Sequence, residues 1–189
     1  MRLTHGVQGT GGGTDPANGD QVVVSSGGVL VSPVSVVVDP EGALIVADQD
    51  AGGAPGAGPG AIVRIDAETG DQEVISAGGL FVSPRGVAID RWGYIIVADG
   101  DASGGGGAVL EVDPLTGTQA VISSGGFFQH PTGLTIGSRG KLLVADEDAL
   151  EGGGAIIQVD RLTGQQTVLS SGGIFVGPSG IVRRAGRGR

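Results

Sequence analysis

The chain has 189 residues, of which 40 are glycine and none is cysteine, and its formal net charge is −9. This length suffices for one domain with a buried core, and the lack of cysteine excludes a disulfide framework, a thiolate metal site and a cysteine nucleophile. The acidic balance argues against nucleic acid or an anionic membrane as the main partner.

The charge is unevenly distributed along the chain. Four of the eleven cations lie after residue 182, so residues 1–182 carry a formal charge of −13. We expect an irregular Gly-rich segment over residues 1–18, a repeat domain over 19–183 and a basic tail over 184–189. No apolar run reaches the length of a membrane helix and no signal-peptide pattern is visible, which predicts a cytoplasmic location, or a secreted one if the true start lies upstream.

Four prolines, each followed by an apolar phrase, open repeats along the chain. The steps between them are 51, 47 and 47 residues, and the extra residues of the first step lie in the Gly/Pro loop 51–60. Length variation confined to a loop between similar strand-sized phrases is typical of a repeat architecture. The repeats open at Pro33, Pro84, Pro131 and Pro178.

Each complete repeat is predicted to contain four short strands. Continuous apolar runs in the second strand, such as Tyr94-Ile-Ile-Val-Ala, are typical of a strand buried on both faces. An Asp-x-x-Thr-Gly turn joins the third strand to a more polar fourth strand, as expected at an outer edge. The predicted first strands cover 34–39, 86–90 and 133–137, the second 43–48, 93–99 and 141–146, and the predicted blades are about 33–79, 84–126 and 131–173.

Four antiparallel strands in about 47 residues match one blade of a β-propeller. The alternative, a β-sandwich, would not explain why the same order of apolar, doubly buried and edge strands recurs. We therefore predict an all-β fold: a β-propeller-type repeat of four-stranded antiparallel blades, with three complete blades and one flanking strand at each end.

The phrase Pro84-Arg-Gly-Val-Ala-Ile-Asp, followed by Gly93-Tyr-Ile-Ile-Val-Ala-Asp, resembles a motif of NHL-repeat and gluconolactonase-like (six-bladed-type) propellers. The resemblance covers about residues 19–183 and implies a partial propeller. In gluconolactonase-like enzymes it also implies a divalent metal held by Glu, Asn and Asp, with the Asn in a Pro-Asn-Gly phrase. The matching positions here are Val34, Arg85, Thr132 and Ser179, so that metal set does not carry over.

The repeats leave an incomplete blade at the two ends of the sequence. Residues 21–28 repeat a fourth-strand phrase and residues 178–182 a first-strand phrase, so the two middle strands are missing unless Leu3 to Gly9 contributes. Three explanations compete: an open partial propeller, a homo-oligomer that completes the ring, and a fragment of a longer propeller. Exposed strand edges favour a homo-oligomer or additional blades from a longer chain.

One face of the predicted propeller gathers repeated Asp-x-Asp pairs beside glycine-rich loops. Calcium prefers such oxygen ligands, which makes it the candidate cofactor. The alternative is that the first aspartate of each pair caps a strand end while the second is solvated. The candidate metal ligands are Asp48, Asp50, Asp99, Asp101, Asp146 and Asp148.

Departures from the repeat are better indicators of a unique site than residues copied in every blade. Phe127, Phe128, His130 and Glu151 depart from the repeat and are the candidate ligand-binding residues. The leading hypothesis is a noncatalytic interaction module that binds a protein or small ligand on the acidic, Gly-rich loop face. The alternatives are a metal-dependent lactonase-type hydrolase, active only in a completed ring, and a fragment of a longer propeller protein with no activity of its own.

Overall fold

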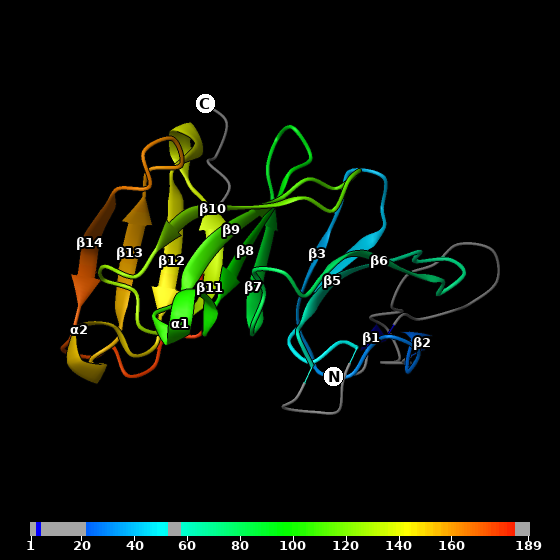
Figure 1. Ribbon diagram of the computed structural model, residues 1–189, viewed down its shortest axis with the longest axis horizontal. Helices are drawn as coiled ribbons and strands as arrows, with labels where there is room; N and C mark the ends of the chain where they lie inside the picture. Colours follow the sequence, from blue (N-terminus) through cyan, green and yellow to red (C-terminus); the bar gives the residue numbers. More distant parts are fainter. Residues whose placement is uncertain (1–2, 5–21, 53–57, 184–189) are drawn as a thin grey trace, which may run out of the picture.

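The computed structural model describes residues 3–4, 22–52 and 58–183. Three four-stranded antiparallel sheets follow one another in this part of the chain, each built from consecutive strands (Figure 1). Blade 1 contains β3 (Pro33–Val38), β4 (Leu44–Asp48), β5 (Ala61–Ile65) and β6 (Gln72–Ala77). Blade 2 contains β7 (Pro84–Ile89), β8 (Ile95–Asp99), β9 (Ala108–Val112) and β10 (Gln119–Ser124). Blade 3 contains β11 (Pro131–Ile136), β12 (Leu142–Asp146), β13 (Ala155–Val159) and β14 (Gln166–Ser171).

This architecture confirms the prediction of an all-β partial propeller with four-stranded antiparallel blades. The flanking strand predicted at the C-terminal end is wrong, because no described strand pairs with residues 178–183. The first strand of each blade starts at its proline, slightly earlier than predicted, because a residue without an N–H is tolerated at the start of a strand. In blades 1 and 2 this strand ends before an aspartate whose carboxylate closes the next turn, whereas blade 3 has Gly137 at this position. Asp90 Oδ1, for example, accepts the N–H groups of Trp92 and Tyr94 at 2.8 and 3.0 Å.

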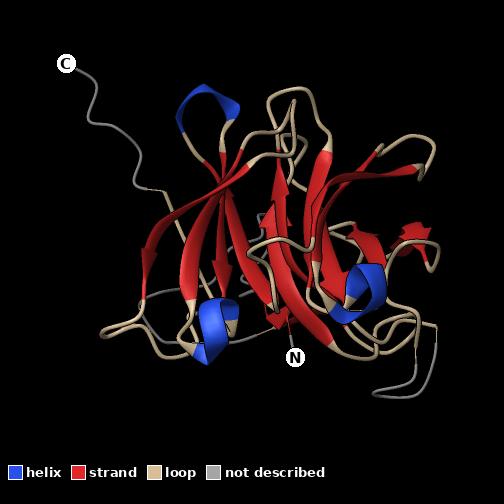
Figure 2. Ribbon diagram, turned by 60° about the vertical axis from the view of Figure 1, so that its left-hand side comes forward, coloured by secondary structure: helices blue, strands red, loops and turns tan. Residues whose placement is uncertain are grey.

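Short helical turns occur in the glycine-rich loops beside two of the Asp-x-Asp pairs and in the turn between β11 and β12. In Figure 2, α1 (Ala102–Gly105) and α2 (Ala149–Gly152) lie at one end of the sheets, while the 3-10 turn η1 (Ser138–Gly140) lies at the opposite end. Ser103 and Gly104 have φ of 58° and 80°, so α1 is a distorted single turn. No helix among the described residues is long and apolar enough to cross a membrane.

The hydrophobic core lies between successive blades. Ile96 and Val109 of blade 2 pack with Leu142 and Ile157 of blade 3, and all four are fully buried. Phe128, from the connection between these blades, fills the same cluster at 1% exposure. Each blade therefore needs a neighbour to bury its faces, as in repeat proteins generally.

A glutamine at the start of each outer strand locks one blade to the preceding connection. Gln119 Nε2 donates to Ser76 Oγ at 2.9 Å and to the Gly78 carbonyl at 3.0 Å, while its Oε1 accepts the Leu80 N–H. Ser76 Oγ in turn donates to the Gly117 carbonyl at 2.8 Å. Gln72 with Ser25 and Gln166 with Ser123 form the same contacts, which we call the Gln–Ser clamp.

The inner strands approach each other closely at the glycine of the Pro-x-Gly phrase. A Cβ on Gly86 would lie 2.9 Å from the Thr132 carbonyl oxygen, and one on Gly133 would lie 2.9 Å from the Ser179 carbonyl oxygen. The absence of a side chain at these positions lets neighbouring blades meet along the axis. Residues 179–180 thus pack on β11 as β11 packs on β7.

Asp160 is expected to make the chain sensitive to acid. The Lys141 ammonium and the N–H groups of Thr163 and Leu162 lower the pKa of Asp160 to about 2. Because the folded pKa is depressed, this stabilisation is present above the ordinary value near 3.8 and is lost as pH falls towards 2. Denaturant unfolding at about pH 5 and about pH 2 should show a smaller loss for Asp160→Asn than for the parent chain. Asp71→Asn, in an exposed turn, should lose as much free energy of unfolding between these two pH values as the parent chain. If Asp160→Asn lost as much as the parent, Asp160 would not be the source of the acid sensitivity.

Candidate functional site on the loop face

The end of the blades that carries α1, α2 and the connections between blades is called the loop face. The first aspartate of each Asp-x-Asp pair ends the second strand of its blade there. These residues, Asp48, Asp99 and Asp146, are fully buried. Their position is set by strand order, since second strands end where the connections to the next blade begin.

These three buried carboxylates accept backbone N–H groups from two loops at once. Asp99 accepts Val82 and Ser83 at 2.9 Å, Asp101 at 3.2 Å and Ala102 at 3.0 Å. Asp48 does the same with Val31, Ser32 and Asp50, and Asp146 with Gln129, His130 and Asp148. Each carboxylate thereby fixes the connection between blades to its own second-to-third loop.

Burial and hydrogen bonding act in opposite directions on Asp99. Burial raises the pKa of Asp99 above its ordinary 3.8, and the four backbone N–H donors lower it by a smaller amount. These donors occupy the carboxylate oxygens that the sequence made available to a cation. The proposed metal role of Asp48, Asp99 and Asp146 stays a prediction, and the structure gives all three a role in positioning loops.

The second aspartates of the pairs differ from blade to blade. Asp50 is buried, with 5% exposure, and is engaged within the protein. The side chains of Asp101 and Asp148 are 49% and 63% exposed, and both approach the same imidazole, that of His130. The pairs of blades 2 and 3 therefore contribute to one cluster.

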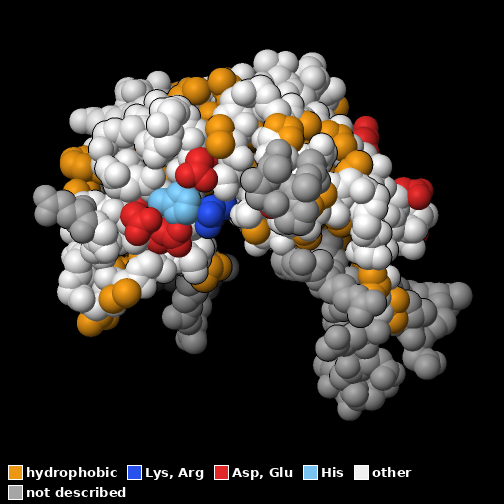
Figure 3. All heavy atoms as spheres, turned by 60° about the horizontal axis from the view of Figure 1, so that its bottom comes forward, with side chains coloured by type: hydrophobic (Ala, Val, Ile, Leu, Met, Phe, Trp, Pro, Cys, Tyr) orange, Lys and Arg blue, Asp and Glu red, His pale blue; other side chains and the backbone are white. Residues whose placement is uncertain are grey.

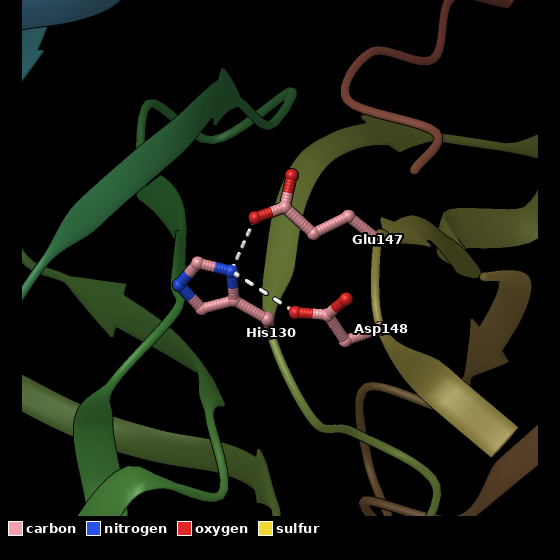
Figure 4. A group of neighbouring side chains, drawn as sticks. All are labelled: His130, Glu147 and Asp148. Atoms are coloured by element: carbon pink, nitrogen blue, oxygen red, sulfur yellow. Dashed lines mark hydrogen bonds and ion pairs between the residues drawn. The ribbon is translucent and has the colours of Figure 1, made fainter. Parts of the chain in front are cut away.

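His130 lies at the centre of this cluster, in the connection that leads into blade 3 (Figure 4). Its Nδ1 is hydrogen-bonded to Glu147 Oε1 and lies 3.9 Å from Asp148 Oδ2. Its Nε2 lies 3.8 Å from Asp101 Oδ1. Potential ligand atoms of His130, Glu147 and Asp148 all lie within 4.8 Å of one another. We call these four residues the His130 cluster.

The space for the imidazole is created by a glycine in blade 2. A Cβ on Gly100 would lie 2.6 Å from His130 Cδ2 and 2.7 Å from Nε2, so any larger residue would displace the ring. In the other two blades the position of Gly100 holds Gln49 and Glu147. The positions equivalent to His130 hold Ser32 and Ser83, so this arrangement occurs once in the described chain.

The cluster has a net negative charge and reaches solvent. Three carboxylates surround the ring, and Arg85 Nη1, 3.8 Å from Glu147 Oε1, offsets one of them, which leaves −2 with a neutral imidazole. Figure 3, which looks onto this end of the molecule, shows a histidine side chain surrounded by acidic side chains, with a basic one beside it. This site is suited to a cationic ligand.

Arg85 and Glu147 connect the cluster to a groove along the inner strands. The groove has a volume of about 430 Å³ and is lined by β3, β7, β11 and residues 179–181. The four positions that follow the repeat prolines, Val34, Arg85, Thr132 and Ser179, all line it. None is asparagine, so these residues do not fit the metal set that the gluconolactonase resemblance implies.

The sequence-predicted ligand residues fall into different environments. Phe128 is a core residue, whereas Phe127 is 42% exposed and lines a separate shallow hollow beside Ser123 and Gln166. The backbone of Glu151 lies in α2, and its side chain is outside the described set. Of the three residues whose side chains are described, His130 alone is brought to the cluster.

Glu147 and Arg85 were not among the sequence-predicted site residues. Glu147 is nevertheless a departure from the repeat, since it stands between Asp146 and Asp148 where the other blades have Gln49 and Gly100. Arg85 departs likewise at the position after the proline. Applying the same rule to these positions would have identified both residues, but their proximity to His130 depends on how blades 2 and 3 pack.

Comparison with known proteins supports the fold. No family model and no curated protein sequence matches the chain. Among solved structures it is similar to a chain of the nidogen/laminin complex, with 18% identity, a TM-score of 0.60 and coverage of 81% of this chain and 51% of that one. It is also similar to a putative gluconolactonase (19%, TM-score 0.60, 95% and 59% coverage) and to TolB from Acinetobacter baumannii (16%, TM-score 0.60, 86% and 38%).

These neighbours are NHL/gluconolactonase-like and other β-propeller proteins, so the predicted resemblance is confirmed at the level of the fold. The chain spans between 38% and 59% of the length of these three propellers, about half.

Proposed function

We propose that this chain is a noncatalytic β-propeller binding module whose acidic loop face takes a cationic ligand at the His130 cluster. The observation that carries the proposal is the convergence of Asp101, Glu147 and Asp148 on His130, with Arg85 as the one counter-charge among the described residues. Scaffolds of this kind host many activities, so the argument rests on the site and not on the fold.

The donor set suits a first-row divalent metal ion better than calcium. Calcium is bound almost entirely by oxygen ligands, whereas a neutral imidazole combined with carboxylates suits ions such as zinc or manganese. A cationic amine or guanidinium on a protein or small ligand would meet the same negative potential. The metal ion alone is the simplest probe of the site.

The lactonase-type alternative has weaker support from the residues. The groove positions Val34, Arg85, Thr132 and Ser179 offer no asparagine for the metal set of that family. The putative gluconolactonase among the neighbours is 19% identical, a likeness that supports the fold alone. The lactonase-type reading requires metal ligands that the described residues do not supply. Binding without catalysis requires only residues that are present at the His130 cluster.

Titration with zinc or manganese is expected to produce heat by calorimetry and to raise the melting temperature. Binding to the folded state alone stabilises it by about 2.7 kcal/mol at a ligand concentration of about 100 times Kd. His130→Ala and Glu147→Gln should weaken binding at least about tenfold, because each removes one ligand group. Calcium should bind more weakly than zinc to the parent chain.

Glu68→Gln is the matched control, since it removes the same charge from the exposed turn between β5 and β6 at the opposite end of the strands. It should leave the metal affinity unchanged. Absence of heat with both zinc and manganese, or equal binding by His130→Ala, would overturn the proposed site.

A further inference from the structure

Every interface between blades in the described chain joins two kinds of face. The face of a blade that meets the next blade is called its trailing face, and the face that meets the preceding blade is its leading face. Ile45 and Ile62 belong to the trailing face of blade 1, and Ile96 and Val109 belong to that of blade 2. All four are at most 2% exposed because a leading face covers them.

The trailing face of blade 3 has no such cover among the described residues. Leu143 and Ile156 occupy the positions of Ile96 and Val109 but are only half-buried, and Leu169 is 52% exposed. Phe175 takes the position of Phe81 and Phe128, which are 3% and 1% exposed, yet it is only partly buried. These four residues form an apolar surface shaped like two others that are covered.

The polar part of the interface is unfilled at the same place. Ser25, Ser76 and Ser123 are buried, and each is held by the glutamine of the following blade. Ser170 occupies the same position in β14 and is exposed. Half of a fourth Gln–Ser clamp is therefore present on blade 3.

The N-terminal end of the described chain, formed by β1, β2 and the first strand of blade 1, is called the leading end. It carries the complementary kind of surface. Val36 and Val38 of β3 are 37% and 60% exposed, whereas Val87 and Leu134, the counterparts of Val36, are 7% and 6% exposed. In blades 2 and 3 these positions pack on a trailing face. In blade 1 no described residue takes the place of that partner.

The strand pairing at the N-terminal end has the register of an outer blade edge. β1 (Leu3–Thr4) pairs with β2 (Val23–Ser25) as Leu3↔Ser25 and Thr4↔Val23, with a bulge between the pairs. β5 and β6 pair as Ile62↔Ser76 and Val63↔Val74, with a bulge at the same point. β1 and β2 are thus the third and fourth strands of an incomplete blade. At the other end residues 178–181 form no strand, but they pack on β11 at the position of a first strand.

From these surfaces we infer that the trailing face of blade 3 binds the leading end of a second copy of this chain. The contact repeats the interface between blades 1 and 2 and the interface between blades 2 and 3. It places residues 178–181 of one copy beside β1 and β2 of the other. The chain spans about half of the solved propellers it matches, so two copies bring the length of a full ring. Such a head-to-tail interface uses different surfaces on the two copies.

Light scattering on the purified 189-residue chain tests this interface. The parent chain is expected at a mass of at least twice 18.5 kDa at micromolar concentration. Leu169→Glu on the trailing face and Val38→Glu on the leading end should each reduce the mass, because a charge would be buried at the contact. Both sites are exposed within one copy, so the melting profile of the monomer should be retained.

Mixing the two variants distinguishes head-to-tail contact from any other association. The Val38→Glu copy keeps a parent trailing face and the Leu169→Glu copy keeps a parent leading end, so an equimolar mixture should form a one-to-one dimer. Leu115→Glu, at a 94% exposed turn position, should leave the parent mass unchanged. Leu169→Ser and Val38→Ser should shift the mass in the same direction with less effect.

Three results would overturn the inference. The first is a monomeric parent chain, which would leave the face to further blades of a longer chain. The second is a parent mass retained by both glutamate variants, and the third is a mixture that stays monomeric.

Discussion

Asp99→Asn is expected to destabilise the chain by at least about 3 kcal/mol, because the buried carboxylate accepts four backbone N–H groups. An asparagine of the same size has one acceptor oxygen and one NH₂ group. The backbone N–H groups of one of the two loops would therefore face the NH₂ group and lose their hydrogen bonds. Denaturant unfolding at neutral pH, followed by circular dichroism, measures this loss. Asp48→Asn and Asp146→Asn should change stability in the same direction.

Asp101→Asn is the matched control for this experiment. Asp101 is two residues away on the same loop, and its side chain is 49% exposed. The substitution should change stability by no more than about 0.5 kcal/mol. If Asp99→Asn were as mild as this control, the carboxylate would not be what holds the two loops together.

Phe128→Ala is expected to cost about 3–5 kcal/mol, the usual range for removing a buried phenylalanine. The ring is 1% exposed and packs with the faces of blades 2 and 3, so its removal opens a cavity at that interface. Thermal and denaturant unfolding should both show the loss. Binding at the His130 cluster should survive in the fraction that remains folded.

Phe127→Ala supplies the comparison, since it removes the same group from the neighbouring residue. Phe127 is 42% exposed, so the expected loss is no more than about 1 kcal/mol. Equal losses in the two variants would contradict the burial difference that separates these residues. If Phe127→Ala weakened the binding of a ligand without changing stability, this would support the ligand-binding role that the sequence predicted for Phe127.

The sequence predicted the blades well because their signals are local. Apolar runs such as Ile95–Asp99 and the Asp-x-x-Thr-Gly turns act within a few residues of chain. Asp113 Oδ1, for example, accepts the N–H groups of Leu115 and Thr116 at 2.8 and 3.1 Å. The fourth strands begin at Gln72, Gln119 and Gln166, two residues after the glycine that ends each of these turns.

The roles of the loop-face residues were harder to predict because they depend on contacts between blades. An exposed Asp-x-Asp pair and a buried one read alike in sequence. Asp146 is held by the N–H groups of Gln129 and His130, which lie 17 and 16 residues away. Phe127 and Phe128 are adjacent, yet the packing of blade 3 on blade 2 buries only the second.

The sequence by itself determined the repeat, the strand order within each blade and the acidity of the loop face, since these follow from periodicity, turn chemistry and charge. Only the tertiary structure decided which side chains meet. It joined His130 to Asp101 and Glu147 across two blades and left the trailing face of blade 3 uncovered by the residues that the structure describes. The physical reason is that a blade is specified by local hydrogen bonding, whereas burial and the convergence of charges arise from packing between blades.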